Sequence, residues 1–213
     1  MVPGIRANKI LKILKKTYPK AKTALDFNTP LEILVATILS AQCTDKRVNM
    51  VTKTLFKKYK NVKDYANIKQ AEFEKDIRTT GFYKNKSKNI IAAANMIIKD
   101  YKGKVPRLMK DLIKLPGVAR KTANIVQQSA YNITEGIAVD THVRRLSQRL
   151  KFTKYNDPKK IEIDLMNIFP KKYWNKVSYV LVSHGRNTCI ARKPKCSECN
   201  ISAMCPSRQM RML

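Results

Sequence analysis

The last 25 residues of the chain hold four cysteines with the spacing C-x6-C-x2-C-x5-C, at Cys189, Cys196, Cys199 and Cys205. Four thiolates this close along a chain bind either zinc or a 4Fe–4S cluster, and the chain between them must then fold into a compact loop. Structural zinc sites more often use two close pairs, whereas one close pair, Cys196 and Cys199, is present here. The spacing therefore favours an iron–sulfur cluster, with zinc as the alternative.

The charge of the chain indicates a polyanionic partner. Lys and Arg number 44 against 15 Asp and Glu, a net charge of +29 over 213 residues. Residues 1–25 and 165–197 contain no acid at all, so the positive charge is gathered in local surfaces. Nucleic acid is the simplest partner for such surfaces. The alternative is a cell whose proteins are rich in lysine throughout.

No segment approaches the ~18 apolar residues that a membrane span requires. The N-terminal stretch IRANKILKILKKTYP places Ile10, Leu11, Ile13 and Leu14 between lysines. This pattern predicts an amphipathic helix that packs on the protein body, and it lacks the continuous apolar core of a signal peptide. We expect a cytoplasmic protein, associated with the nucleoid if the source is prokaryotic. In that compartment five cysteines do not form a disulfide framework, and Cys43 is expected to be a packed core thiol.

Helical periodicity runs along the chain and strand alternation does not, so the sequence predicts an all-α fold. Residues 29–32, TPLE, form a capping box with Thr29 as N-cap and Glu32 three positions on. Behind it, Leu31, Leu34, Val35, Ile38 and Leu39 fall on one helical face. Further helices are expected near 45–59, 70–78, 85–101, 107–114, 118–131, 141–151, 158–168 and 172–184.

The stretch LPGVARKTA, residues 115–123, interrupts this pattern with a proline and a glycine and then restarts it. Gly117 permits backbone angles that other residues resist, and the N–H groups that open the next helix have no intrahelical partners. Such a turn can hold one phosphate through backbone N–H groups and the helix dipole. For this stretch alone, the alternative is an ordinary corner between two helices without a ligand. In so lysine-rich a chain, Lys121 by itself does not indicate a functional site.

Taken together, these motifs resemble the endonuclease III family of DNA glycosylases and abasic-site lyases. The cysteine spacing resembles the iron–sulfur loop of that family, and LPGVARKTA resembles its helix-hairpin-helix. IAVDTHVRR (137–145) resembles the segment with the catalytic aspartate. SAQCTD (40–45) and TGFYKNKSKNI (80–90) resemble two segments that approach the lesion.

The resemblance implies an all-α, two-lobed helix-hairpin-helix DNA glycosylase fold with a C-terminal 4Fe–4S loop. A central domain, residues 24–133, would face a second lobe made of residues 1–23 and 134–213, with DNA across the cleft between them. The four cysteines would hold a 4Fe–4S cluster that acts as a structural clip. The implied partner of this monomer is double-stranded DNA with damaged pyrimidines or abasic sites, and no membrane is involved.

By the same resemblance Lys121 is the nucleophile and Asp140 the catalytic carboxylate. The amine of Lys121 would attack C1′ of a flipped-out nucleotide, expel the base and form a Schiff base, from which β-elimination follows. This attack needs a neutral amine, which a helix N-terminus, the neighbouring Arg120 and partial desolvation favour. In VDTHVRRL, Asp140 is also well placed as an N-cap. A capped carboxylate stays ionised, which suits it to stabilise positive charge at C1′.

The resemblance also suggests which residues meet DNA. The Gln42 amide would fill the space of the flipped base, and the Phe82 ring would wedge between base steps; the alternative for both is packing on their own lobe. Lys84, Lys86 and Lys193 would hold phosphates. The remaining expected contacts are Leu115, Gly117, Ala119, Arg120 and His142.

One departure from the family pattern lies in the hairpin, where Ala119 replaces a second glycine. Alanine is tolerated there if the position is already helical. Two other functions remain open at this point: a monofunctional mismatch glycosylase of the same fold and a non-catalytic DNA-binding iron–sulfur protein. The former lacks the lysine, so Lys121 and Asp140 together favour the bifunctional enzyme.

Overall fold

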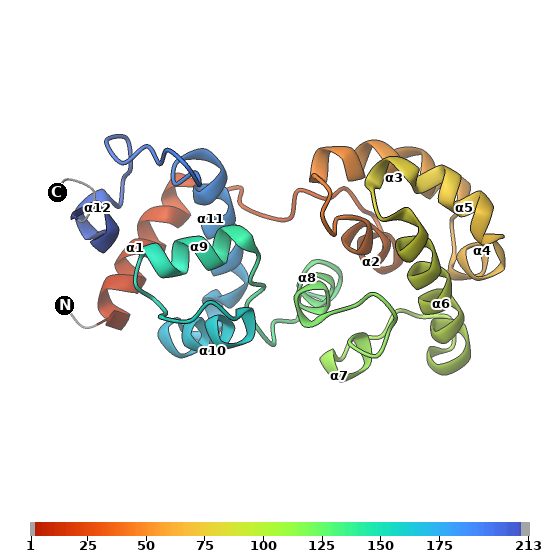
Figure 1. Ribbon diagram of the computed structural model, residues 1–213. Coiled ribbons are helices and arrows are strands. Elements are labelled where there is room, and N and C mark those ends of the chain that lie inside the picture. The colour runs from red at the N-terminus through yellow and green to blue at the C-terminus, as the bar shows by residue number, and fades with distance from the viewer. Residues whose placement is uncertain (1–2, 210–213) are drawn as a thin grey trace. The chain divides into compact units, whose positions relative to one another are not determined.

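The computed structural model describes residues 3–209, and within that range the chain forms helices and connecting loops without a strand (Figure 1). The all-α prediction is confirmed for these residues. The α-helices are α1 Pro3–Thr17, α2 Pro30–Leu39, α3 Asp45–Lys58, α4 Val62–Asn67, α5 Gln70–Ile77, α6 Tyr83–Tyr101, α7 Met109–Leu112, α8 Arg120–Tyr131, α9 Thr141–Arg149, α10 Pro158–Ile168, α11 Trp174–Asn187 and α12 Pro206–Gln209. Short 3-10 turns add η1 Arg78–Thr80, η2 Lys171–Tyr173 and η3 Ser202–Met204.

The chain divides into two compact units, each with its own hydrophobic core. Unit 2 is continuous, runs from Thr23 to Ile133 and contains α2 to α8. Unit 1 joins the segment that ends at Lys22 to the chain from Thr134 onward, so it contains α1 and α9 to α12. Of the second lobe expected from the sequence, residues 1–2 and 210–213 lie outside the described residues.

Helix α2 is the centre of unit 2. Every residue from Ile33 to Leu39 is buried, so α2 is enclosed on all sides rather than on the one face that the sequence pattern predicts. It packs against α8, α3 and α6. The cap differs slightly from expectation: Thr29 Oγ1 accepts from the Glu32 N–H at 3.2 Å, but the Glu32 carboxylate accepts from the N–H of Asn28, one residue before the N-cap.

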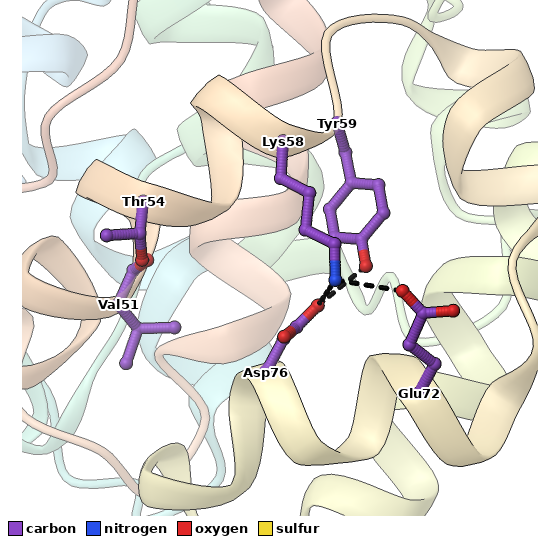
Figure 2. Close-up of polar contacts among 6 residues, drawn as sticks. All are labelled: Val51, Thr54, Lys58, Tyr59, Glu72 and Asp76. Carbon is purple, nitrogen blue, oxygen red and sulfur yellow. Dashed lines mark hydrogen bonds and ion pairs between the residues drawn. The ribbon is translucent and has the colours of Figure 1, made fainter.

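A polar network joins α3 to α5 within unit 2 (Figure 2). Lys58 Nζ lies 2.9 Å from both Glu72 Oε1 and Asp76 Oδ2, and the Tyr59 hydroxyl donates to the same Asp76 oxygen at 2.6 Å. Burial of the ring, together with the bond to Asp76, raises the pKa of Tyr59 to about 12. The network therefore connects the C-terminal end of α3 to α5 through the half-buried carboxylate of Asp76.

Helix α4 is absent from the sequence-based prediction. It spans six residues, too few for apolar periodicity to show. Its signal was the capping box: the Asn61 side chain accepts from the backbone N–H of Lys63 and Asp64, and the Asp64 side chain accepts from the Asn61 N–H. Polar caps of this kind can start a helix that contains too few apolar residues for periodicity to predict it.

In unit 1, α1 packs against α11 and α10. Ala7, Ile10, Leu11 and Leu14 are buried, which confirms an amphipathic helix docked on the protein body. The guanidinium of Arg6 adds a polar tie by donating to the carbonyl of residue 150 at 2.6 Å. None of the described helices is both long and apolar enough to cross a membrane.

Candidate functional site

The stretch LPGV forms a tight turn between α7 and α8. The Val118 N–H donates to the Leu115 carbonyl at 3.0 Å, and Gly117 has φ +78°, the pattern of a type II turn with Pro116 at its second position. A Cβ on Gly117 would lie 3.0 Å from the Cβ of Asn89 on α6. Both the backbone angle and the close neighbour therefore require glycine.

Helix α8 begins directly after this turn, with Ala119 as its N-cap. The expectation that Ala119 is already helical is wrong, because its backbone is extended, with φ −82° and ψ 168°. Alanine is nevertheless tolerated, since any L-residue adopts this negative φ. The methyl side chain supplies no cap acceptor to the first N–H groups of α8. Lys121, the second residue of α8, is exposed, so unit 2 does not give it the partial desolvation that we expected.

Two of the expected DNA contacts share an unusual backbone. Gln42 has φ 53° and Phe82 has φ 48°, both in the left-handed region that non-glycine residues seldom adopt. Both side chains are exposed, and Phe82 retains 61% of its accessible surface. Core packing therefore does not hold the phenyl ring of Phe82 in this position.

The structure corrects two predicted DNA contacts. Lys86 is only 4% exposed, and its Nζ donates to the carbonyls of Leu39 at 2.7 Å and Thr80 at 2.8 Å. A buried ammonium committed to two carbonyls cannot hold a phosphate, and burial lowers the pKa of Lys86. Leu115 is also buried, and its N–H donates to the Leu112 carbonyl, so neither its side chain nor its amide is offered to DNA. Lys84 and Lys193 are exposed, as a phosphate contact requires.

Asp140 is the N-cap of α9, as the sequence predicts. One carboxylate oxygen accepts from the Val143 N–H at 2.8 Å. The apolar residues before it, 137–139, are buried. Side chains of α10 and α11 hold the backbone of this extended segment. Glu162 accepts from the Ile137 N–H at 3.2 Å, and Ser178 donates to the Ala138 carbonyl at 2.8 Å. Asp140 is therefore placed by buried bonds on both sides.

The other end of α9 holds the start of the cysteine loop. Arg145 donates to the carbonyls of Gly185 and Cys189 at 2.9 and 3.0 Å, and Arg149 donates to Cys189 Sγ at 3.1 Å. Sequence reasoning missed both arginines, because their acceptors lie about 40 residues away along the chain. His142 is half-buried with Nδ1 3.2 Å from an Arg145 nitrogen, and burial lowers its pKa.

The four cysteines of the C-terminal loop line one pocket, together with His184, Arg149 and the apolar side chains of Leu146 and Ile201. In the described residues, no group of three or more His, Cys, Asp or Glu side chains surrounds a single ion position. The guanidinium of Arg149 donates to Cys189 Sγ, and His184 Nε2 lies 3.6 Å from Cys199 Sγ. Four soft thiolate ligands, one of them with a guanidinium donor beside it, fit an iron–sulfur cluster. The fifth cysteine, Cys43, packs half-buried against the core of unit 2.

Comparison with known proteins identifies this arrangement. The family model of HhH-GPD superfamily base excision DNA repair proteins matches residues 35–171, and that of the iron–sulfur binding domain of endonuclease III matches residues 189–205. The endonuclease III of Synechocystis sp. is 52% identical over 96% of this chain and 93% of its own length. The chain belongs to the endonuclease III family.

Further relatives agree with this assignment. The endonuclease III of Bacillus subtilis is 46% identical over 91% of the chain and 89% of its own length. A solved structure of endonuclease III trapped as a covalent intermediate with DNA superposes with a TM-score of 0.95 over 100% of both chains, at 42% identity. The helix-hairpin-helix glycosylase fold and the 4Fe–4S cofactor are thus confirmed, and zinc is not supported.

Membership of the endonuclease III family fixes the activity. The protein functions in base excision DNA repair as a DNA glycosylase with abasic-site lyase activity, acting on damaged pyrimidines. The two alternatives, a monofunctional mismatch glycosylase and a non-catalytic DNA-binding protein, are not supported.

Proposed function

We propose that Lys121 is the nucleophile of this glycosylase and lyase, and that Asp140 is its catalytic carboxylate. The observation that carries the proposal is the start of α8. Gly117 turns the chain, Ala119 leaves the helix N-terminus without a side-chain cap, and Lys121 stands exposed in the first turn. A phosphate bound at this N-terminus would hold the backbone of a nucleotide beside the amine.

The proposed reaction starts on a nucleotide flipped out of the duplex, because C1′ is inaccessible in a stacked helix. The neutral amine of Lys121 attacks C1′ and the glycosidic bond breaks, so the base leaves with the bonding electron pair and takes up a proton. Opening of the sugar ring then yields a Schiff base between Lys121 and C1′. Loss of a proton from C2′ expels the 3′ phosphate by β-elimination, and water hydrolyses the remaining Schiff base to free the lysine.

In this proposal, Asp140 stabilises the positive charge that develops at C1′. Its bond from the Val143 N–H fixes the orientation of the carboxylate. The buried segment 137–139, which leads to Asp140, resists displacement when DNA binds, because two side chains from neighbouring helices hold its backbone. Preorganised charge of this kind needs no rearrangement at the moment of reaction.

DNA contacts follow from exposure and charge. Gln42 and Phe82 enter the duplex at the lesion, Lys84 and Lys193 bind phosphates, and we expect DNA affinity to fall steeply with salt. His142 and Arg120 support the same backbone contacts. We further propose that the protein acts as a monomer on double-stranded DNA, in the cytoplasm and at the nucleoid of a prokaryote, with residues 24–133 and the rest of the chain as its two DNA-binding lobes.

Cys189, Cys196, Cys199 and Cys205 would hold the 4Fe–4S cluster, which closes the loop that carries Lys193. When bound, the cluster supplies a rigid covalent framework for this loop. Arg149 contributes from the protein side, since it ties the first ligand and the carbonyls of residues 190 and 191 to the end of α9.

Borohydride trapping tests the nucleophile. The protein is incubated with duplex DNA that contains one abasic site, and borohydride reduces any Schiff base to a stable protein–DNA adduct. We expect an adduct with the unchanged protein and none with Lys121→Ala, while Lys99→Ala, which removes an exposed lysine at the end of α6, keeps it. An adduct of undiminished yield with Lys121→Ala would refute the assignment. Asp140→Asn should still bind abasic DNA but form the adduct more slowly.

A further inference from the structure

The buried amine of Lys86 has no place in the reaction just described, yet it occupies a distinctive position in unit 2. Its two acceptors are the carbonyls of Leu39, the last residue of α2, and Thr80, the last residue of η1. Final carbonyls of a helix lack intrahelical partners and carry the negative end of its dipole. Lys86 thus joins the C-terminal ends of two separate helical elements through one nitrogen.

Both elements lead directly to a strained, exposed residue. Gln42 follows Leu39 by three positions and Phe82 follows Thr80 by two, and both have positive φ. The backbone N–H of Lys86 also donates to the Phe82 carbonyl at 3.1 Å. Left-handed backbone at non-glycine residues persists only where surrounding bonds over-determine it. Lys86 provides such bonds to both loops at their bases.

The burial of this group makes the bonds difficult to replace. Leu39 and Thr80 are themselves buried, so water cannot take the place of the ammonium without opening the core. Loss of the ammonium would leave the buried carbonyls of Leu39 and Thr80 without this hydrogen-bond donor. The loop that carries Gln42 and the loop that carries Phe82 would then be free to shift against each other. Lys99, near the end of α6, is exposed and provides a natural comparison.

We propose that Lys86 is a positioning residue that sets the spacing between the Gln42 loop and the Phe82 loop, so that both side chains enter the duplex at one lesion. The inference rests on the proposed roles of these two side chains in DNA. It assigns to Lys86 an effect on base removal from duplex DNA, where the helix must be opened. Strand cleavage at an abasic site in single-stranded DNA needs no such opening and is independent of Lys86.

The test compares Lys86→Met, which keeps the length of the side chain but not its donors, with Lys99→Met, which removes the same charge from the surface. We expect Lys86→Met to slow single-turnover excision from duplex DNA by about 10- to 100-fold, the loss typical of a small misplacement. Cleavage of single-stranded abasic DNA should stay within about threefold, and Lys99→Met should leave both rates within about threefold. Equal losses on both substrates with Lys86→Met, or no loss on duplex DNA, would overturn the proposal.

A double-mutant cycle separates positioning from general destabilisation. If Lys86 acts through Phe82, then Lys86→Met costs much less in a Phe82→Ala background than in the unchanged protein. Independent, multiplicative losses would refute the coupling. If Gln42→Ala and Phe82→Ala themselves excise at the normal rate, the proposed roles of those residues fail instead. Should Lys86→Met not fold, Lys86→Arg, which keeps a cation but moves its donors, is measured against the same criteria.

Discussion

Replacing Gly117 by alanine tests the hairpin geometry in a quantitative way. Its φ of +78° places an L-residue in the left-handed region, at a cost of roughly 1–2 kcal/mol. The new Cβ would also lie 3.0 Å from the Cβ of Asn89, and overpacking of this kind typically costs about 1–3 kcal/mol. Gly117→Ala should therefore reduce the free energy of unfolding by about 2–5 kcal/mol.

Gly103 is the matched control for this substitution. It lies in the same unit with φ +74°, but a Cβ there would meet nothing within 4 Å. Gly103→Ala should therefore lose the backbone part alone, about 1–2 kcal/mol. Urea denaturation followed by far-UV circular dichroism measures both variants, and an unchanged slope identifies a change in native stability.

The two variants together separate the causes. Equal losses for Gly117→Ala and Gly103→Ala would show that Asn89 yields without cost and would refute the contact argument. Losses below about 0.5 kcal/mol for both, the usual range for neutral surface changes, would refute the backbone argument as well. We also expect Gly117→Ala to weaken binding of abasic DNA, since the turn precedes the proposed phosphate site.

Three further outcomes are expected. Asp76→Asn removes the carboxylate shared by Lys58 and Tyr59, so the urea midpoint should fall, and by less at high salt because salt screens the ion pair. Folding lowers the pKa of His142, so the folded state loses stability relative to the unfolded state as the pH falls below the ordinary histidine pKa of ~6.5. His142→Gln should therefore lose less stability than the unchanged protein between about pH 7 and pH 5, as measured by urea midpoints. Arg149→Met removes the N–H donor to the first cluster ligand, so the visible absorbance of the cluster should decay faster under an iron chelator than in the unchanged protein.

Local signals in the sequence were sufficient to place the starts of some helices. Asp140 caps α9 because the backbone N–H that its carboxylate accepts from lies only three residues further along the chain, and the same holds for Thr29 at α2. The role of the four cysteines was predictable for a similar reason, since their spacing alone restricts the bound group to zinc or an iron–sulfur cluster. Features of this kind depend on residues close together along the chain.

Tertiary partners decide the rest. The sequence predicts a surface lysine at position 86, because no residue nearby in the sequence indicates that the Leu39 carbonyl, 47 positions away, will accept from it. Arg149 likewise finds its sulfur acceptor 40 positions away. Ala119 was misjudged for a different reason: whether a residue is the N-cap or the first helical residue depends on a single ψ angle, which composition does not specify.

The division of the chain into units has a consequence for biosynthesis. Unit 2 is continuous, whereas α1 is made first and packs against α11, which is completed only at residue 187. At ribosomal rates of about 5–20 residues per second, roughly 8–35 s separate the two helices. Until α11 has been made, Ile10, Leu11 and Leu14 lack part of the core that buries them in the folded protein. The N-terminal helix therefore leaves the ribosome first but can complete its packing only after α11 has been made.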